Sequence, residues 1–152
     1  MDFGFTAEEE RFRGEVRQFV QTELPPDWEA SVGGVFGDEE GMDRDFVLEV
    51  RRKLAKRGWL TLGWPVEYGG GGASHLYQAL FAEEMAYHRV PGRDGAALRM
   101  LGPTLMHWGT EEQKRQYLPP IGRGEVQWSQ GYSEPGSGSD LASLQTRAVE
   151  DG

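Results

Sequence analysis

The stretch EVQWSQGYSEPGSGSD, residues 125–140, separates two kinds of pattern in this sequence. In its first half, Val126, Trp128 and Tyr132 alternate with polar or small residues, and alternation with period two predicts a β-strand. Its second half is rich in glycine, serine and proline, which is typical of a turn. A second strand is predicted in SLQTRAV, residues 143–149, with hairpin-turn chemistry at residues 151–152.

Upstream of residue 125 the pattern is helical, because apolar residues recur every three or four positions and glycine or proline ends each run. Helices are predicted from the capping box at Thr6 and Glu9 to Pro25, at residues 43–57, 74–88 and 95–108, and from the capping box at residues 110–113 to Leu118. Pro103 should split the region 95–108, and Pro119 and Pro120 should stop the last helix. Residues 31–41 are predicted to form a loop.

These patterns predict a mainly α fold with an incomplete β part. Residues 1–124 are expected to form a helical domain, and residues 125–152 the start of a β domain. Two strands alone do not make an independent domain, so we expect the β domain to be completed by chain that this sequence lacks.

The composition excludes several classes of function. With 25 acidic against 16 basic residues, the net charge is -9, which argues against a nucleic-acid partner. The sequence has no cysteine, so disulfides and thiolate metal sites are excluded. It shows no apolar run of membrane-spanning length and no signal peptide, so a cytoplasmic protein is expected.

The glycine-serine turn at residues 132–140 has the chemistry of an anion site. Gly136 and Gly138 would let a ligand approach the backbone amides, and successive amides form an anion-binding concavity. Ser137 and Ser139 add hydroxyl donors. The residues alone leave two interpretations open: a phosphate or pyrophosphate site, or a surface turn in which Asp140 bonds nearby amides.

Four segments together resemble the acyl-CoA dehydrogenase family. They are YSEPGSGSD at 132–140, GWPVEYGG at 63–70, FAEEMAYHRVP at 81–91 and GTEEQKRQYLPPIGRGE at 109–125. Their order and spacing agree with the family, whose fold is an N-terminal helical domain, a middle β domain and a C-terminal four-helix bundle. The resemblance implies that this chain holds the first domain and the edge of the second.

The resemblance implies a flavin enzyme that oxidises acyl-CoA to 2,3-enoyl-CoA with FAD. It places Tyr132 and Ser133 at the isoalloxazine edge, and Gly138 and Ser139 at the FAD pyrophosphate. Ser139 would also lie near the acyl-CoA thioester, and Leu98 and Met100 would line the acyl pocket. The family's catalytic base lies in the C-terminal domain. No catalytic residue is therefore assigned here, and the 152-residue chain alone is expected to be inactive.

The resemblance also implies partners. They are an acyl-CoA substrate, an electron-transferring flavoprotein or similar acceptor, and further subunits in a homo- or hetero-oligomer. YSEPGSGSDLASLQTRA, residues 132–148, resembles members that act on bulky or cyclic acyl-CoA, including those of steroid breakdown. The alternative is a non-catalytic remnant that serves as a subunit-pairing helical module.

Several other polar and aromatic residues are expected to have structural roles. Glu134 is expected to bond nearby amides, and Trp59 and Trp64 to pack the helical domain. Glu83, Glu84 and His88 share one helix but lack the paired Glu-x-x-His spacing of a di-iron site, so no metal is expected. The basic run Arg51, Arg52, Lys53, Lys56 and Arg57 is expected to form a solvated face that offsets the helix dipole.

Overall fold

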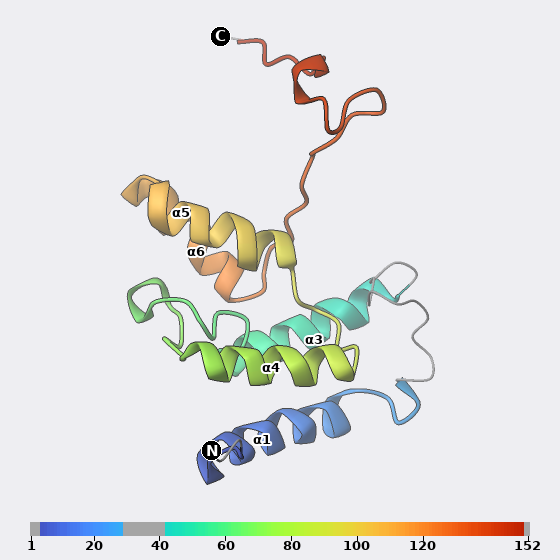
Figure 1. Ribbon diagram of the computed structural model, residues 1–152, viewed down its shortest axis with the longest axis vertical. Coiled ribbons are helices and arrows are strands. Elements are labelled where there is room, and N and C mark those ends of the chain that lie inside the picture. Colours follow the sequence, from blue (N-terminus) through green and yellow to red (C-terminus); the bar gives the residue numbers. More distant parts are fainter. Residues whose placement is uncertain (1–3, 29–41, 151–152) are drawn as a thin grey trace.

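The computed structural model describes residues 4–28 and 42–150, and over these residues the fold is helical (Figure 1). The α-helices are α1 Ala7–Glu23, α3 Arg44–Lys56, α4 His75–Tyr87, α5 Gly102–Trp108 and α6 Glu111–Gly122. A π-helical segment, η2 Ala96–Leu101, leads into α5, and short 3-10 turns occur at η1 Val66–Tyr68 and η3 Leu141–Ser143. The predicted loop at 31–41 and the turn at 151–152 lie outside the described residues.

The helix boundaries follow the predicted caps. Thr6 and Glu9 close a reciprocal capping box on α1, and Thr110 and Gln113 do the same on α6. Gly58 ends α3 with φ +70°, a left-handed conformation that glycine adopts without strain. Pro103 stands in the first turn of α5, as predicted. Local side chains therefore define where these helices begin and end.

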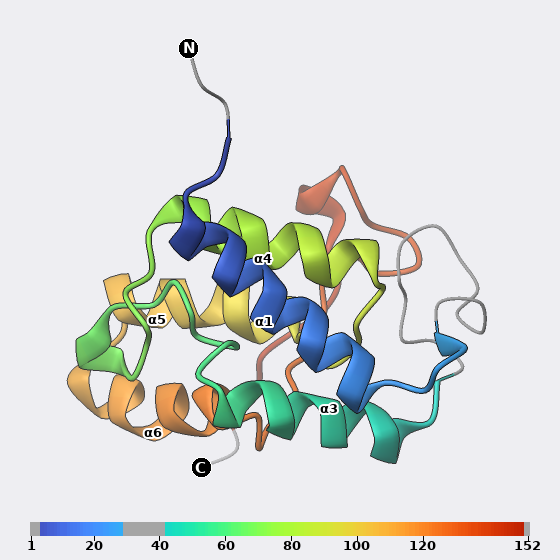
Figure 2. The same cartoon turned by 90° about the horizontal axis from the view of Figure 1, so that it is seen from below.

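The helices form tiers. In Figure 1, α1 lies below the pair α3 and α4, and α5 and α6 form the tier above them. The view from below shows α1 running across the space between α3 and α4 (Figure 2). This position allows one face of α1 to bury its apolar side chains against both helices.

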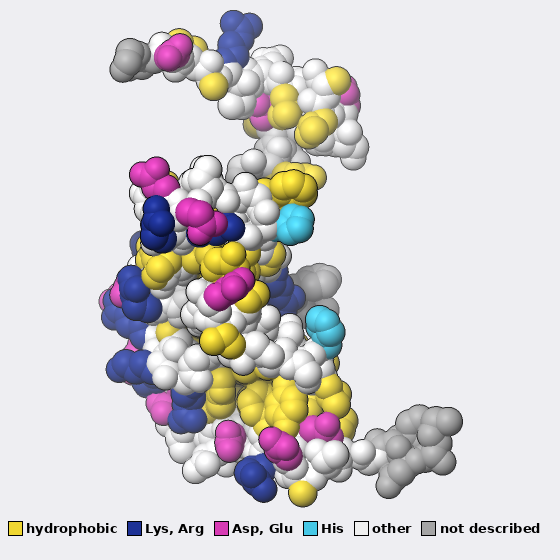
Figure 3. Space-filling model, turned by 90° about the vertical axis from the view of Figure 1, so that its left-hand side faces the viewer, with side chains coloured by type: hydrophobic (Ala, Val, Ile, Leu, Met, Phe, Trp, Pro, Cys, Tyr) yellow, Lys and Arg dark blue, Asp and Glu magenta, His cyan; other side chains and the backbone are white. Residues whose placement is uncertain are grey.

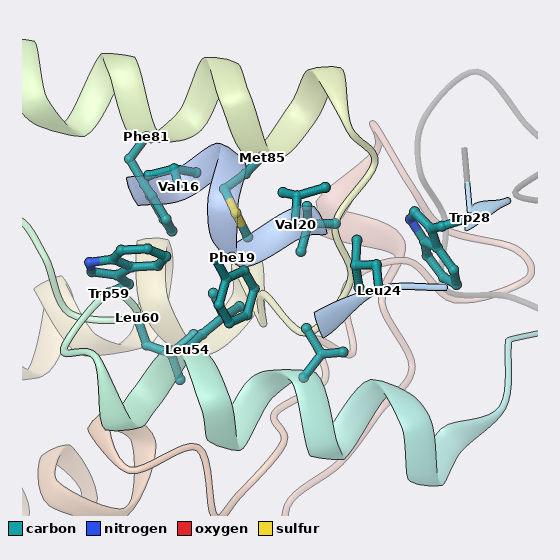
Figure 4. Close-up of a cluster of buried hydrophobic side chains, with 12 residues drawn as sticks. Val16, Phe19, Val20, Leu24, Trp28, Leu54, Trp59, Leu60, Phe81 and Met85 are labelled. Carbon is teal, nitrogen blue, oxygen red and sulfur yellow. The ribbon is translucent and has the colours of Figure 1, made fainter. Parts of the chain in front are cut away.

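The main core lies between α1, α3, α4 and the loop that follows α3 (Figure 4). Phe19 is fully buried, and its ring meets that of Trp59 at 5.5 Å; Phe81 approaches the same Trp59 ring at 5.6 Å. Trp64 lies in a second cluster with Ala97, Leu118 and Ile121, at the base of α5 and α6. The expectation that Trp59 and Trp64 pack the helical domain is confirmed.

The prediction that α6 stops at Leu118 is wrong, because the helix continues through Pro119 and Pro120 to Gly122. Leu118 and Ile121 are both 2% exposed, so the extra turn places Ile121 in the second core cluster. The carbonyl of Pro119 still accepts a hydrogen bond from the backbone N–H of Arg123. Burial therefore overrides the cost of the missing proline N–H groups.

The two predicted strands are not formed within the described residues. The segment 126–132 pairs with no other segment, and the only bridge in the tail joins Glu134 to Ser137. The second predicted strand begins inside η3 and continues without regular structure. A strand needs a neighbour that accepts and donates its backbone hydrogen bonds, and no other described segment pairs with the tail in this way.

One residue of the basic run is not solvated as expected. Arg51 is 1% exposed, and its Nε donates to the carbonyl of Gly92 at 3.1 Å. Its position on the inner face of α3 takes it into the body of the domain, where it joins α3 to the segment after α4. Lys53, in contrast, stays partly exposed and pairs with Glu23 and Glu49.

Candidate functional site

The glycine-serine turn is closed by its own hydrogen bonds. The backbone N–H of Glu134 donates to the Ser137 carbonyl at 2.8 Å, and the Ser137 N–H donates back to Glu134 at 3.1 Å. Ser137 is buried, and its hydroxyl donates to the Asp140 carbonyl at 2.8 Å. Ser137 therefore stabilises the turn from inside and presents no hydroxyl to a ligand.

Glu134 has the structural role expected from the sequence. Its carboxylate accepts the backbone N–H groups of Gln145 at 2.9 Å and Thr146 at 2.7 Å, as well as the Thr146 hydroxyl. The hydrogen bond from the Thr146 side chain, followed by the two backbone bonds, lowers the pKa of Glu134. The ionised carboxylate thus ties the turn to the segment that follows η3.

The four predicted cofactor residues lie on the outside of this turn. Tyr132, Ser133, Gly138 and Ser139 are all exposed, and within the described chain no hydrogen bond uses the side chain of Tyr132, Ser133 or Ser139. Gly138 has no positive φ, and an added Cβ would meet only the Ser133 hydroxyl, at an ordinary 3.7 Å. The fold of the chain therefore does not itself require glycine at 138, whereas a ligand approaching the amides would.

A groove of about 970 Å³ opens between α4, the segment 59–65 and the η2–α5 region. Its walls are mixed: the apolar side chains of Trp59, Phe81 and Leu98 line it together with polar ones, among them Gln78 and Arg99. Trp64 supports this wall by donating its Nε1 hydrogen to the Leu98 carbonyl at 3.2 Å. Met100 is 49% exposed and does not line the groove, so the two predicted acyl-pocket residues lie on different sides of η2.

Asp94 joins the two regions that carry the predicted site residues. Its Oδ1 accepts the backbone N–H of Ala97, in the first turn of η2, at 3.0 Å. Its Oδ2 accepts the backbone N–H of Trp128, in the tail, at 2.7 Å. Asp94 was not among the residues predicted from the sequence, although an Asp three residues before a helical position is a capping signal.

The Glu84 carboxylate is held by arginines rather than available for a metal. Its side chain is 4% exposed and accepts Nε of Arg13 at 2.8 Å and Nε of Arg17 at 2.9 Å. Burial acts to raise the pKa of Glu84, but the hydrogen bonds and charges of Arg17 and Arg13 outweigh burial and lower it. Over residues 4–28 and 42–150 there is no cluster of three metal-ligating side chains.

In the same described ranges, no helix is both long enough and apolar enough to cross a membrane.

The helical tiers, with the polar turn beyond them, define the class as a helical domain, and comparisons with known proteins identify its family. The sequence profile of the acyl-CoA dehydrogenase N-terminal domain matches residues 6–125. The chain therefore belongs to the acyl-CoA dehydrogenase family.

Curated relatives agree over the whole chain. Acyl-CoA dehydrogenase FadE26 of Mycobacterium tuberculosis is 40% identical over 152 residues, which are 100% of this chain and 37% of that protein. Acyl-CoA dehydrogenase IpdE1 of Mycolicibacterium smegmatis is 40% identical over 93% of this chain and 36% of that protein. The chain thus spans little more than a third of the length of these relatives.

Solved structures show the same fold. The steroid acyl-CoA dehydrogenase Tcur3481-Tcur3483 superposes with a TM-score of 0.83 and 42% identity, covering 100% of this chain and 38% of that chain. The ChsE4-ChsE5 complex of Mycobacterium tuberculosis gives a TM-score of 0.80 and 38% identity, covering 100% and 37%. The prediction of a mainly helical dehydrogenase domain is confirmed.

Proposed function

We propose that this chain is the N-terminal part of a flavin-dependent enzyme that oxidises an acyl-CoA thioester to the 2,3-enoyl-CoA. The observation that carries the proposal is that residues 132–140 contain two groups of side chains, one bonded within the turn and one facing outward. Ser137 and Glu134 are used inside the turn, whereas the polar atoms of Tyr132, Ser133 and Ser139 face outward without a partner in the described chain.

The outward residues fit FAD. The Ser139 hydroxyl and the bare amide at Gly138 would donate hydrogen bonds to the pyrophosphate, and Tyr132 and Ser133 would contact the edge of the isoalloxazine ring. Bound FAD would supply the two-electron oxidation of the Cα–Cβ bond, which no amino-acid side chain can perform. This chain's residues would bind and orient the flavin, and the catalytic base would come from elsewhere in the enzyme.

The acyl group that we propose is bulky and cyclic. A solved structure of 42% identity is described as a steroid acyl-CoA dehydrogenase. Its name, Tcur3481-Tcur3483, joins the names of two proteins. We accordingly propose that the chain works in a hetero-oligomer with further subunits, and, as a separate partner, an electron-transferring flavoprotein or a similar acceptor that takes the electrons. Leu98 and Met100 remain the proposed acyl contacts, with only Leu98 on the wall of the groove.

Paired serine variants test the flavin contacts in a protein that carries all the family's domains. Ser139→Ala should weaken FAD binding about tenfold or more, because a hydrogen bond to a charged phosphate is lost. Ser137→Ala is the comparison variant: its hydroxyl is bonded to the Asp140 carbonyl inside the turn, so its loss should weaken FAD binding less than Ser139→Ala does. Flavin fluorescence released on dilution measures both affinities.

Two outcomes would contradict the proposal. Equal FAD affinity in the Ser139→Ala variant and the parent would reduce Ser139 to a turn residue. A parent protein that binds FAD but does not oxidise any of a series of straight-chain and cyclic acyl-CoA esters would favour the non-catalytic helical module instead.

A further inference from the structure

Asp94 makes the only hydrogen bond between residues 126–150 and the helical body within the described chain. Trp128 also attaches the tail by packing: its ring meets Tyr117 edge-on at 5.7 Å and 82°, and it lies against the second core cluster around Trp64. Beyond Trp128 the tail stands apart from α5 and α6 (Figure 1). The position of the tail relative to the body is therefore set where Asp94 meets Trp128.

The other oxygen of the Asp94 carboxylate, Oδ1, binds the backbone at the start of η2. It accepts the Ala97 N–H, and the Asp94 carbonyl accepts the Leu98 N–H at 2.9 Å. Hydrogen bonds to an ionised carboxylate are shorter and stronger than bonds between neutral groups. One side chain thus fixes the start of η2 and the start of the tail against each other.

The bonds from Ala97 and Trp128 to Asp94 form a joint between η2 and the tail. The acyl-side and the flavin-side residues of the proposed site both lie close to this joint along the chain. Leu98 and Met100 belong to η2, within one turn of Ala97. Tyr132 is four residues beyond Trp128, so even a fully extended backbone places it within about 14 Å of the joint. A shift at Asp94 would change the spacing between these two groups of residues.

We infer that Asp94 is a positioning residue that holds the flavin-side segment, residues 128–139, in register with the acyl-side segment, residues 96–101. Asp94 touches neither ligand and acts through the two backbone amides that it binds. The inference rests on the proposed function only for the identity of the two ligands; the joint itself is a property of the chain.

Amide hydrogen exchange, resolved residue by residue by NMR, tests the joint in the chain itself. Asp94→Ala should speed exchange at both Ala97 and Trp128 by about tenfold to a hundredfold. Asp94→Asn keeps a single acceptor oxygen, so protection should be lost at one of the two amides and kept at the other. Unchanged exchange at Trp128 in Asp94→Ala would overturn the inference.

Asp43 provides the matched control. Its Oδ1 also accepts two backbone N–H groups, those of Asp45 and Phe46, but both belong to α3. Asp43→Ala should speed exchange at Asp45 and Phe46 and leave Trp128 as protected as in the parent. If Asp43→Ala exposed Trp128 equally, the effect would be general destabilisation and Asp94 would have no special role.

A binding cycle tests the positioning role in a protein with all the family's domains. The affinity of FAD is measured with and without acyl-CoA, which gives a coupling factor between the two ligands. Asp94→Ala should lower this factor by about threefold to tenfold, and Asp43→Ala should leave it unchanged. Coupling that survives in Asp94→Ala would overturn the inference, whereas failure of the parent to bind FAD would overturn the proposed function and leave the exchange result standing.

Discussion

The helical body, residues 6–124, and the tail, residues 125–150, differ in how their side chains are used. The body buries Val16, Phe19 and Val50 completely, whereas Tyr132 and Val149 in the tail are 71% and 83% exposed. The space-filling view shows the tail projecting beyond the rest of the molecule (Figure 3). The body stabilises itself by burial, while the tail is shaped by local hydrogen bonds and leaves its chemistry facing outward.

The largest expected difference concerns aromatic rings. Phe19→Ala should lower the free energy of unfolding by about 3–5 kcal/mol, because it opens a cavity beside Trp59 in the main core. Tyr132→Ala should change it by about 0.5 kcal/mol or less. Urea denaturation followed by tryptophan fluorescence measures both, and similar losses for the two variants would contradict the division into body and tail.

Glycines give a second contrast. A Cβ at Gly70 would lie 2.0 Å from the Trp64 carbonyl oxygen, so Gly70→Ala must move the backbone and should cost about 1–3 kcal/mol. A Cβ at Gly136 meets nothing within 4 Å, and Gly136→Ala should be within about 0.5 kcal/mol of the parent. Thermal unfolding of the pair checks this. Equal melting temperatures of the two variants would contradict the prediction and show that the backbone around Gly70 can shift at little cost.

Two carboxylates with lowered pKa values give the third contrast, which is of about the same size as that of the glycines. Glu84→Gln should destabilise the body by about 1–3 kcal/mol at neutral pH, because it weakens the bonds to Arg13 and Arg17. Since the folded pKa of Glu84 lies below its ordinary 4.5, its stabilisation is present above pH 4.5 and is lost as the pH falls through the folded pKa. The difference between parent and variant should therefore shrink as the pH falls from 4.5 through the folded pKa.

Glu134→Gln is the tail's counterpart to that variant. The pKa of Glu134 is also lowered, but its bonds reach only Gln145 and Thr146 within the tail. At each pH, the urea midpoint of the body should therefore be the same in Glu134→Gln as in the parent. Urea titrations at several pH values test both variants, and a midpoint that moved with Glu134→Gln would show that the tail unfolds together with the body.

The sequence predicted most reliably where a signal is local. Thr6 with Glu9 and Thr110 with Gln113 mark two helix starts, because a capping box needs only residues three positions apart. Gly58 marks a helix end for the same reason, since its left-handed backbone is a property of one residue. The four family segments, each of them a local pattern, together identified the family, which the comparisons with relatives confirm.

Predictions that depended on distant neighbours failed or were missed. Pro119 and Pro120 do not end α6, because Ile121 is drawn into a core made with Trp64 and Ala97. Arg51 is buried because α3 turns that face inward, toward Gly92. The alternation at 126–132 did not produce a strand, because a strand depends on a partner for its hydrogen bonds.

The candidate site divides in the same way. The sequence by itself determined the residue types: a turn with bare amides at Gly138, a hydroxyl at Ser139 and an acid at Glu134 that caps neighbouring amides. Only the tertiary structure decided that Ser137 is turned inward, that Leu98 and Met100 face different ways, and that Asp94 joins η2 to the tail. The physical reason is that capping and turn chemistry act over a few bonds. Burial and the pairing of Ala97 with Trp128 on one carboxylate arise only when segments some 30 residues apart meet.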